Sequence, residues 1–171
     1  IFLDNVRVPV TDRLGEEGHG WQVCMATAGF ERGLMLRSPA RYQAAVSRLI
    51  ALWKERREQV VPSMAERVAK CWMDAEAYAL SVYATACKID DGGKIGPESS
   101  TNKIFWSELD LEITRAALDM LGDEAELMPG PDEGEGWLDD YIFALAGPIY
   151  AGSNEIQRNI IAERMLGLPR A

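Results

Sequence analysis

Apolar residues recur every three or four positions along four segments of the chain, a spacing typical of amphipathic helices. The first segment begins after Gly20 and runs to about Trp53. Pro39 lies inside it, and proline removes a backbone N–H donor from a helix interior. We therefore expect one long helix that is kinked at Pro39.

The second and third segments have recognisable ends. Ser63 and Glu66 form an S-x-x-E pattern, which predicts a capping box at the start of a helix that ends at the Asp/Gly cluster 90–93. The third segment follows Gly96-Pro97 and ends before Gly122. Both segments predict helices with one apolar face.

The fourth segment is the C-terminal helix. Ser153 is the expected N-cap, and Gly167 and Pro169 are the expected terminators. The preceding region, residues 123–137, is an acidic loop rich in Gly and Pro. Four helices joined by loops of under about 16 residues predict an all-α, four-helix up-and-down bundle.

The N-terminal stretch has a different pattern. Residues 1–9 alternate between apolar and polar, which predicts a β-strand that leads into a turn. A lone strand has no sheet to pair with, so we expect residues 1–17 to be the end of a preceding β-domain with its connector. Residues 18–171 are then the helical domain, and the chain is a piece of a larger protein.

The amino-acid composition narrows the class of protein to which this chain can belong. With 171 residues, 47% hydrophobic and 26% charged, the chain resembles an ordinary globular domain. A net charge of −9 argues against nucleic acid as a partner, because phosphate binding needs clustered basic residues. Cys24, Cys71 and Cys87 have no zinc or disulfide spacing, and no apolar run is long enough to span a membrane. We expect a cytoplasmic protein.

General catalytic motifs are absent from the sequence: it has no phosphate-binding loop, no dinucleotide-binding glycine motif and no serine-hydrolase elbow. His19 is the only histidine, so a di-iron bundle, which needs two Glu-x-x-His pairs, is excluded. We predict no metal site.

One segment near the C-terminus has a sequence specific enough to indicate a function. Residues 149–167 read IYAGSNEIQRNIIAERMLG, with a glycine before a Ser-capped helix, so the backbone there can approach a ligand closely. This string resembles the C-terminal signature of the acyl-CoA dehydrogenase family. The resemblance extends to residues 6–21, similar to the junction between the family's β-domain and helical domain, and to Lys103-Ile104-Phe105.

The resemblance implies α,β-dehydrogenation of an acyl-CoA thioester, in which a carboxylate removes the α-proton and FAD accepts a hydride. Most members carry the base where this chain has Ala151, and alanine cannot accept a proton. Isovaleryl-CoA and long-chain dehydrogenases instead carry it on the first long helix, before an arginine, as in Glu31-Arg32 here. Glu31 is therefore the expected catalytic base; the alternative is an ordinary surface glutamate.

The remaining site residues are also implied by the resemblance. Substrate would be bound by Gly29, Phe30, Arg32, Ala151 and Gly152, and FAD would be contacted by Ser153, Asn154 and Glu155. The expected partners are an acyl-CoA substrate, an electron-transfer flavoprotein and further subunits in a homo- or hetero-oligomer formed through this domain.

Two family patterns for FAD are not preserved. An Arg-x-x-Phe-Gly segment is replaced by residues 55–60, and a glycine-rich run by residues 118–124 with added acids. Acidic groups repel a pyrophosphate. An unlike subunit could complete the FAD site while this chain supplies Glu31, or this chain could be a non-catalytic structural subunit. A related flavin oxidase or monooxygenase is a third alternative.

Overall fold

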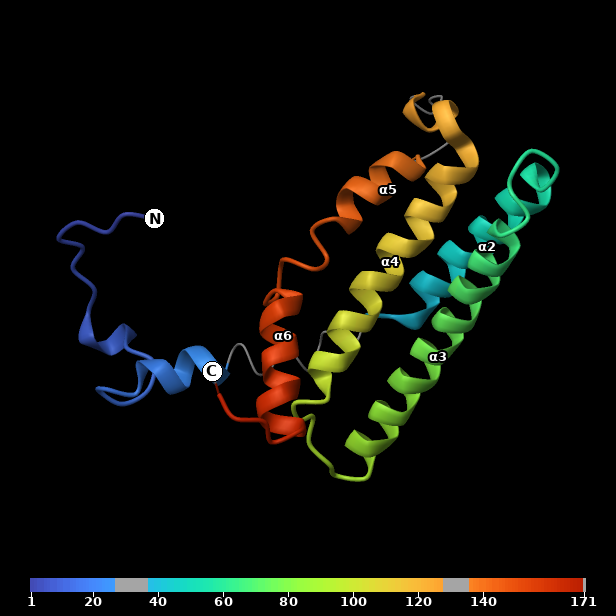
Figure 1. Ribbon diagram of the computed structural model, residues 1–171. Coiled ribbons are helices and arrows are strands. Elements are labelled where there is room, and N and C mark those ends of the chain that lie inside the picture. Colours follow the sequence, from blue (N-terminus) through green and yellow to red (C-terminus); the bar gives the residue numbers. More distant parts are fainter. Residues whose placement is uncertain (27–36, 128–135, 171) are drawn as a thin grey trace. The chain divides into compact units, whose positions relative to one another are not determined.

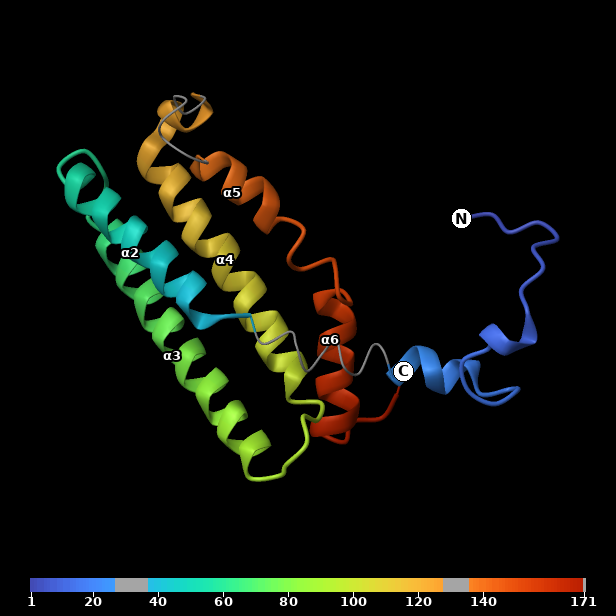
Figure 2. The ribbon, with the colours of Figure 1, turned by 180° about the vertical axis from the view of Figure 1, so that it is seen from behind.

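The computed structural model describes residues 1–26, 37–127 and 136–170, which fall into two compact units, Ile1–Met35 and Leu36–Ala171. Every regular element among these residues is helical, which confirms the predicted all-α class. In the second unit, α4 lies at the centre and packs against α2, α3, α5 and α6 (Figures 1 and 2).

Helix α2 (Pro39–Arg56) corrects the prediction of a single kinked helix. Residues 37 and 38 are not helical, and Pro39 stands at the first position of α2. Ser38 has ψ 123°, because the proline ring disfavours a helical conformation in the preceding residue. The proline therefore begins a helix, where its missing N–H costs nothing.

Helix α3 (Met64–Asp90) follows a short connection, and α4 (Ser99–Leu121) runs back beside it. The predicted capping box is wrong. Ser63 already has helical dihedral angles, φ −62° and ψ −16°, and its side chain makes no capping bond. A side-chain cap requires a non-helical residue at this position.

The core lies between α2, α3 and α4. Tyr42 and Tyr78 meet edge to face with ring centroids 5.2 Å apart, and the fully buried Trp106 side chain is the largest in the core. The other core residues are Val46, Leu49, Met64, Val68, Cys71, Ala75, Leu109, Ile113, Ala116, Ala117 and Met120.

The C-terminal part completes the bundle. A 3-10 turn (Gly122–Glu126) ends α4, and α5 (Trp137–Ala144) packs on α4. Helix α6 (Asn154–Ile160) continues as a π-helical turn (Ile161–Met165), and Gly167 with φ 66° follows it. None of the helices in the described ranges is long and apolar enough to cross a membrane.

The N-terminal unit contains a 3-10 turn (Val10–Asp12) and is helical over residues 20–26. The strand predicted for residues 1–9 is not formed. A strand requires hydrogen bonds to a neighbouring strand, and no described residue provides one. The apolar side chains of Ile1, Phe2 and Leu3 are exposed.

Candidate functional site

The turn before α6 has an unusual backbone. Ala151 and Gly152 are consecutive left-handed residues, with φ 57° and 85°. Ser153 then caps α6 as predicted, since its hydroxyl accepts from the Ile156 N–H at 3.5 Å. The Gln157 side chain reaches back and donates to the Ala151 and Gly152 carbonyls at 3.2 and 3.3 Å. The turn is therefore held by its own helix.

Replacing Gly152 by Ala should destabilise this turn. A Cβ there would lie 2.7 Å from the Gln157 Nε2, and φ 85° is unfavourable for a residue with a Cβ. We expect a loss of about 2 kcal/mol in the free energy of unfolding, part of it from strain and part from displacement of Gln157.

The control for this prediction is Gly92→Ala. Gly92 has φ 80°, but a Cβ there would meet nothing within 4 Å, so this variant measures the cost of the backbone conformation alone. Chemical denaturation of both variants gives the comparison. Equal losses at the two positions would contradict the role given to Gln157.

Asn154 fastens the turn to α4. Its side chain is buried; Oδ1 accepts from Lys103 Nζ at 2.6 Å, and Nδ2 donates to Ser107 Oγ at 3.1 Å. Its backbone N–H donates to the Pro148 carbonyl at 2.8 Å. Burial lowers the pKa of Lys103, while the Glu155 carboxylate opposes this effect. The amide oxygen is thus the acceptor for a buried ammonium group.

Charged groups surround this buried pair. Arg158 donates to Glu108 Oε1 at 2.5 Å, and Glu108 also accepts from Asn154 Nδ2 at 3.4 Å. The pKa of Glu155 is lowered by a hydrogen bond from its own backbone amide and by the Ser153 hydroxyl. The first turn of α6 therefore carries an ionised carboxylate.

Tyr150 is anchored on the other side of the turn. Arg37 donates to its hydroxyl, and the same guanidinium lies 4.5 Å from the Trp106 ring centroid. Tyr78 donates from its hydroxyl to the Arg37 carbonyl at 3.0 Å. Segments that are far apart in the sequence thus meet at the residue before Ala151.

The structure brings together the predicted residues of the turn, Ala151 to Glu155. Gly29, Phe30, Glu31 and Arg32 lie outside the described residues, so their assignments remain predictions. The predicted FAD contact by Asn154 also remains a prediction, although its side chain faces α4 and not solvent.

Sequence reasoning missed the polar groups of α4 that support the turn. Polar residues recur along α4 at alternating intervals of three and four, and all are buried: Ser100, Lys103, Ser107, Asp110 and Thr114. Burial raises the pKa of Asp110, and the Arg41 guanidinium, 3.0 Å away, opposes this. This polar stripe was readable in the sequence as a second periodic pattern beside the apolar one.

The far end of the bundle is acidic. Arg56 makes two hydrogen bonds to the Glu124 carboxylate, at 2.8 and 2.5 Å. Residues 54–58 and 122–126 together hold five carboxylates and three basic groups. Because Arg56 is paired and the net charge is negative, these residues do not fit a pyrophosphate.

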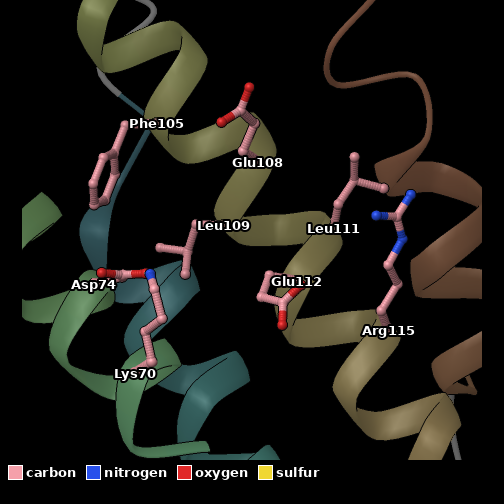
Figure 3. Close-up of a pocket in the computed structure, with 8 residues that line it drawn as sticks. All are labelled: Lys70, Asp74, Phe105, Glu108, Leu109, Leu111, Glu112 and Arg115. Atoms are coloured by element: carbon pink, nitrogen blue, oxygen red, sulfur yellow. The ribbon is translucent and has the colours of Figure 1, made fainter. Parts of the chain in front are cut away.

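An open groove of about 490 Å³ lies between α3 and α4 (Figure 3). Phe105, Leu109 and Leu111 are its apolar lining, and Lys70, Asp74, Glu108, Glu112 and Arg115 are its charged lining. Several of these charges are paired, for instance Lys70 with Asp74 and Arg67 with Glu112. Of the predicted site residues that the structure describes, Ala151 to Glu155, none lines this groove.

Comparison with known families gives a match over residues 18–166 to the sequence model described as "Acyl-CoA dehydrogenase, C-terminal domain". Acyl-CoA dehydrogenase IpdE1 of Mycobacterium tuberculosis is 35% identical in an alignment of 171 positions that covers 99% of this chain and 44% of that protein. IpdE1 of Mycolicibacterium smegmatis is 36% identical, with 99% and 42% covered. The chain spans less than half the length of these curated relatives.

Solved structures share the fold. A chain of the ChsE4-ChsE5 complex from Mycobacterium tuberculosis has a TM-score of 0.78 and 27% identity, with 99% of this chain and 46% of that chain covered. The structure titled "Tcur3481-Tcur3483 steroid ACAD" has a TM-score of 0.82 at 20% identity, with 99% and 45% covered. The latter likeness concerns the fold alone.

Proposed function

Because this chain belongs to the acyl-CoA dehydrogenase family, whose C-terminal domain it matches, we propose that it acts within an FAD-dependent enzyme that oxidises an acyl-CoA thioester. The product is the α,β-unsaturated thioester. The carboxylate that starts the reaction is Glu31.

The observation that carries this proposal is the turn at Ala151. The turn has a left-handed backbone, and Gln157 and Asn154 hold it in place. The side chain of Ala151 is a methyl group, which cannot remove a proton. The base must then come from another segment, and the family resemblance points to Glu31 beside Arg32.

In this reaction Glu31 takes the α-proton, while Ala151 and Gly152 border the thioester. FAD supplies the acceptor for the β-hydride. Proton removal by a carboxylate is effective when burial beside apolar surface raises the pKa of that carboxyl group toward the working pH. An electron-transfer flavoprotein would be the electron acceptor of the complete enzyme.

We propose that an unlike subunit holds the FAD pyrophosphate. The carboxylates around the Arg56–Glu124 pair argue against binding it at that end of this chain. A structural relative was solved as a complex of two proteins, ChsE4 and ChsE5, which supports a mixed assembly. The three cysteines, which are free in this structure, favour a reducing compartment such as the cytoplasm.

Flavin content tests this function. We expect the intact protein purified by itself to hold well under one FAD per chain, and its complex with an unlike subunit to hold FAD and to reduce an electron-transfer flavoprotein when acyl-CoA is added. Absorbance of released flavin gives the ratio. One FAD per chain in the protein alone would contradict the mixed site, and peroxide formation in place of acceptor reduction would favour the oxidase alternative.

A second candidate is a non-catalytic subunit of the same assembly. The acidic end of the bundle favours it, since a chain that cannot complete an FAD site can serve assembly alone. The two candidates differ in whether turnover depends on Glu31.

A further inference from the structure

The Arg37 side chain is half-buried just before α2 and has no carboxylate partner among the described residues. The arginines inside α2 are all paired with carboxylates: Arg41 with Asp110, Arg48 with Asp140, and Arg56 with Glu124. An arginine side chain stays protonated in proteins, and a charge that is taken out of water without a partner costs free energy. An oxygen that accepts hydrogen bonds is therefore the group missing beside Arg37.

The guanidinium group of Arg37 is held in place by two aromatic rings. Its central carbon, Cζ, lies 4.5 Å from the centroid of the Trp106 ring and 5.4 Å from that of the Tyr150 ring. It donates a hydrogen bond to the Tyr150 hydroxyl, which leaves its other N–H groups available. The Arg37 backbone is fixed as well, because Tyr78 donates to its carbonyl. A ligand would thus meet a planar donor group that is already oriented.

The charge around Arg37 is not balanced. Burial raises the pKa of the Asp110 carboxyl group, and the charges of Arg41 and Arg37 oppose this effect. Arg41 lies 3.0 Å from the Asp110 carboxylate and already pairs with it. Two guanidinium groups therefore act on one carboxylate, and the charge of Arg37 is left over. This surplus attracts a negatively charged or strongly polar acceptor.

Donors without acceptors gather around Arg37. Two buried polar atoms of the described side chains have no hydrogen-bond partner, the Trp106 Nε1–H and the Tyr42 hydroxyl. Trp106 stacks on Arg37, and burial raises the pKa of Tyr42 while the charge of Arg37 opposes this. Buried donors normally have acceptors. The cluster thus lacks an acceptor oxygen, and the described residues do not supply it.

Arg37 is close to the place that the proposed function gives to the thioester. The Tyr150 hydroxyl that accepts from Arg37 belongs to the residue directly before Ala151, and Ala151 borders the thioester in that function. The phosphates of CoA are separated from the thioester by the whole pantetheine arm, so they do not fit the missing acceptor. The acyl group starts at the thioester, and it is the part of the substrate that can reach Arg37.

We propose that Arg37 is a specificity-determining residue that binds an oxygen function, a carboxylate or a ketone, on the acyl group of the substrate. The proposal rests on the proposed function and adds a substrate class to it, an oxygenated acyl-CoA in place of a plain fatty acyl-CoA. Guanidinium groups form strong, charge-assisted hydrogen bonds to such oxygens. The Tyr150 hydroxyl, whose own hydrogen has no acceptor among the described residues, donates to the same oxygen.

The test uses the complete FAD-loaded enzyme. A straight-chain acyl-CoA is compared with the same thioester carrying a terminal carboxylate, and with the same thioester carrying a ketone next to the terminal methyl group. Chain lengths from hexanoyl to dodecanoyl offer the oxygen at different depths. We expect the wild type to prefer an oxygenated thioester, in kcat/KM and in Kd. Arg37→Met should lower this preference about 10- to 100-fold, because hydrogen bonds to a charged group are lost.

Two further variants separate recognition from a general effect of losing an arginine. Arg37→Lys keeps the charge but not the planar donor group, so it should retain part of the preference. Arg48→Met removes an arginine that also stacks on an aromatic ring, that of Trp137, but is paired with Asp140. This control should keep the wild-type preference. Circular dichroism checks that all variants remain helical.

A wild type with no preference for oxygenated thioesters at any chain length, or an undiminished preference in Arg37→Met, would overturn the proposal. The carboxylate and ketone series decide which oxygen function is bound. Failure of the proposed function is distinguishable, because the thioesters would then bind without being oxidised, and the Kd values would still test Arg37. If no thioester bound, both proposals would fail.

Discussion

We expect the Glu31→Gln enzyme to oxidise its acyl-CoA thioester about 10³-fold more slowly than the wild type, since a positioned general base contributes roughly 10² to 10⁴ in rate. Glutamine keeps the size and polarity of the side chain but cannot accept a proton. Because Ala151 offers no substitute, little activity should remain. Steady-state kinetics with an electron-transfer flavoprotein as acceptor measure the change.

Glu16→Gln is the matched control, since it removes an exposed carboxylate from the same N-terminal unit. It should retain wild-type kcat. The loss of activity in Glu31→Gln should appear in kcat, while the midpoint of thermal unfolding and the mass of the assembled enzyme stay unchanged. Turnover that survives Glu31→Gln would favour the non-catalytic subunit.

Asn154→Leu should produce the largest loss of stability. The leucine is similar in size but leaves the buried Lys103 ammonium without the acceptor at 2.6 Å. Removing one partner of a buried charged contact costs about 3 kcal/mol or more. For a domain of this size, that lowers the midpoint of thermal unfolding by about 10 °C.

A second substitution separates the destabilisation caused by the unpaired buried charge from that caused by lost packing. Lys103→Met in the Asn154→Leu background removes the unpaired ammonium, so the double variant should unfold at a higher temperature than Asn154→Leu alone. A double-variant cycle gives the coupling between the two residues. If the two losses simply add, Lys103 and Asn154 do not act as a pair.

The helices could be predicted where the apolar period was continuous. The structure confirms the second and third long helices, the part of the first that follows Pro39, and the Ser153 cap. Burial of an apolar stripe and a local capping bond are both readable from neighbouring residues. Predictions failed where two local signals competed. Pro39 was given the effect of a kink, but its fixed φ and its constraint on Ser38 favour a helix start.

The supports of the candidate site could not be found from apolar spacing alone. Lys103 and Asn154 are 51 positions apart, and their contact depends on how α6 packs on α4. A lysine in a helix is normally exposed. Only the polar residues at the same spacing, such as Ser107 and Asp110, indicate that this face of α4 is buried and needs polar partners.

At the acidic end of the bundle, by contrast, the relevant feature could be seen in the sequence. The departure from the family pattern near residues 55–60 and 118–124 was visible in the sequence, but its consequence for Arg56 was not. The structure pairs Arg56, one of the two adjacent arginines that could have met a phosphate, with Glu124.

The central claim is that Glu31 replaces the carboxylate missing at residue 151. The most direct measurement is the rate of flavin reduction after rapid anaerobic mixing of the complete FAD-loaded enzyme with acyl-CoA, for wild type, Glu31→Gln and Glu31→Gln/Ala151→Glu. We predict fast reduction in the wild type, almost none in Glu31→Gln, and partial recovery when the carboxylate returns at residue 151. Reduction of Glu31→Gln at the wild-type rate would contradict the account.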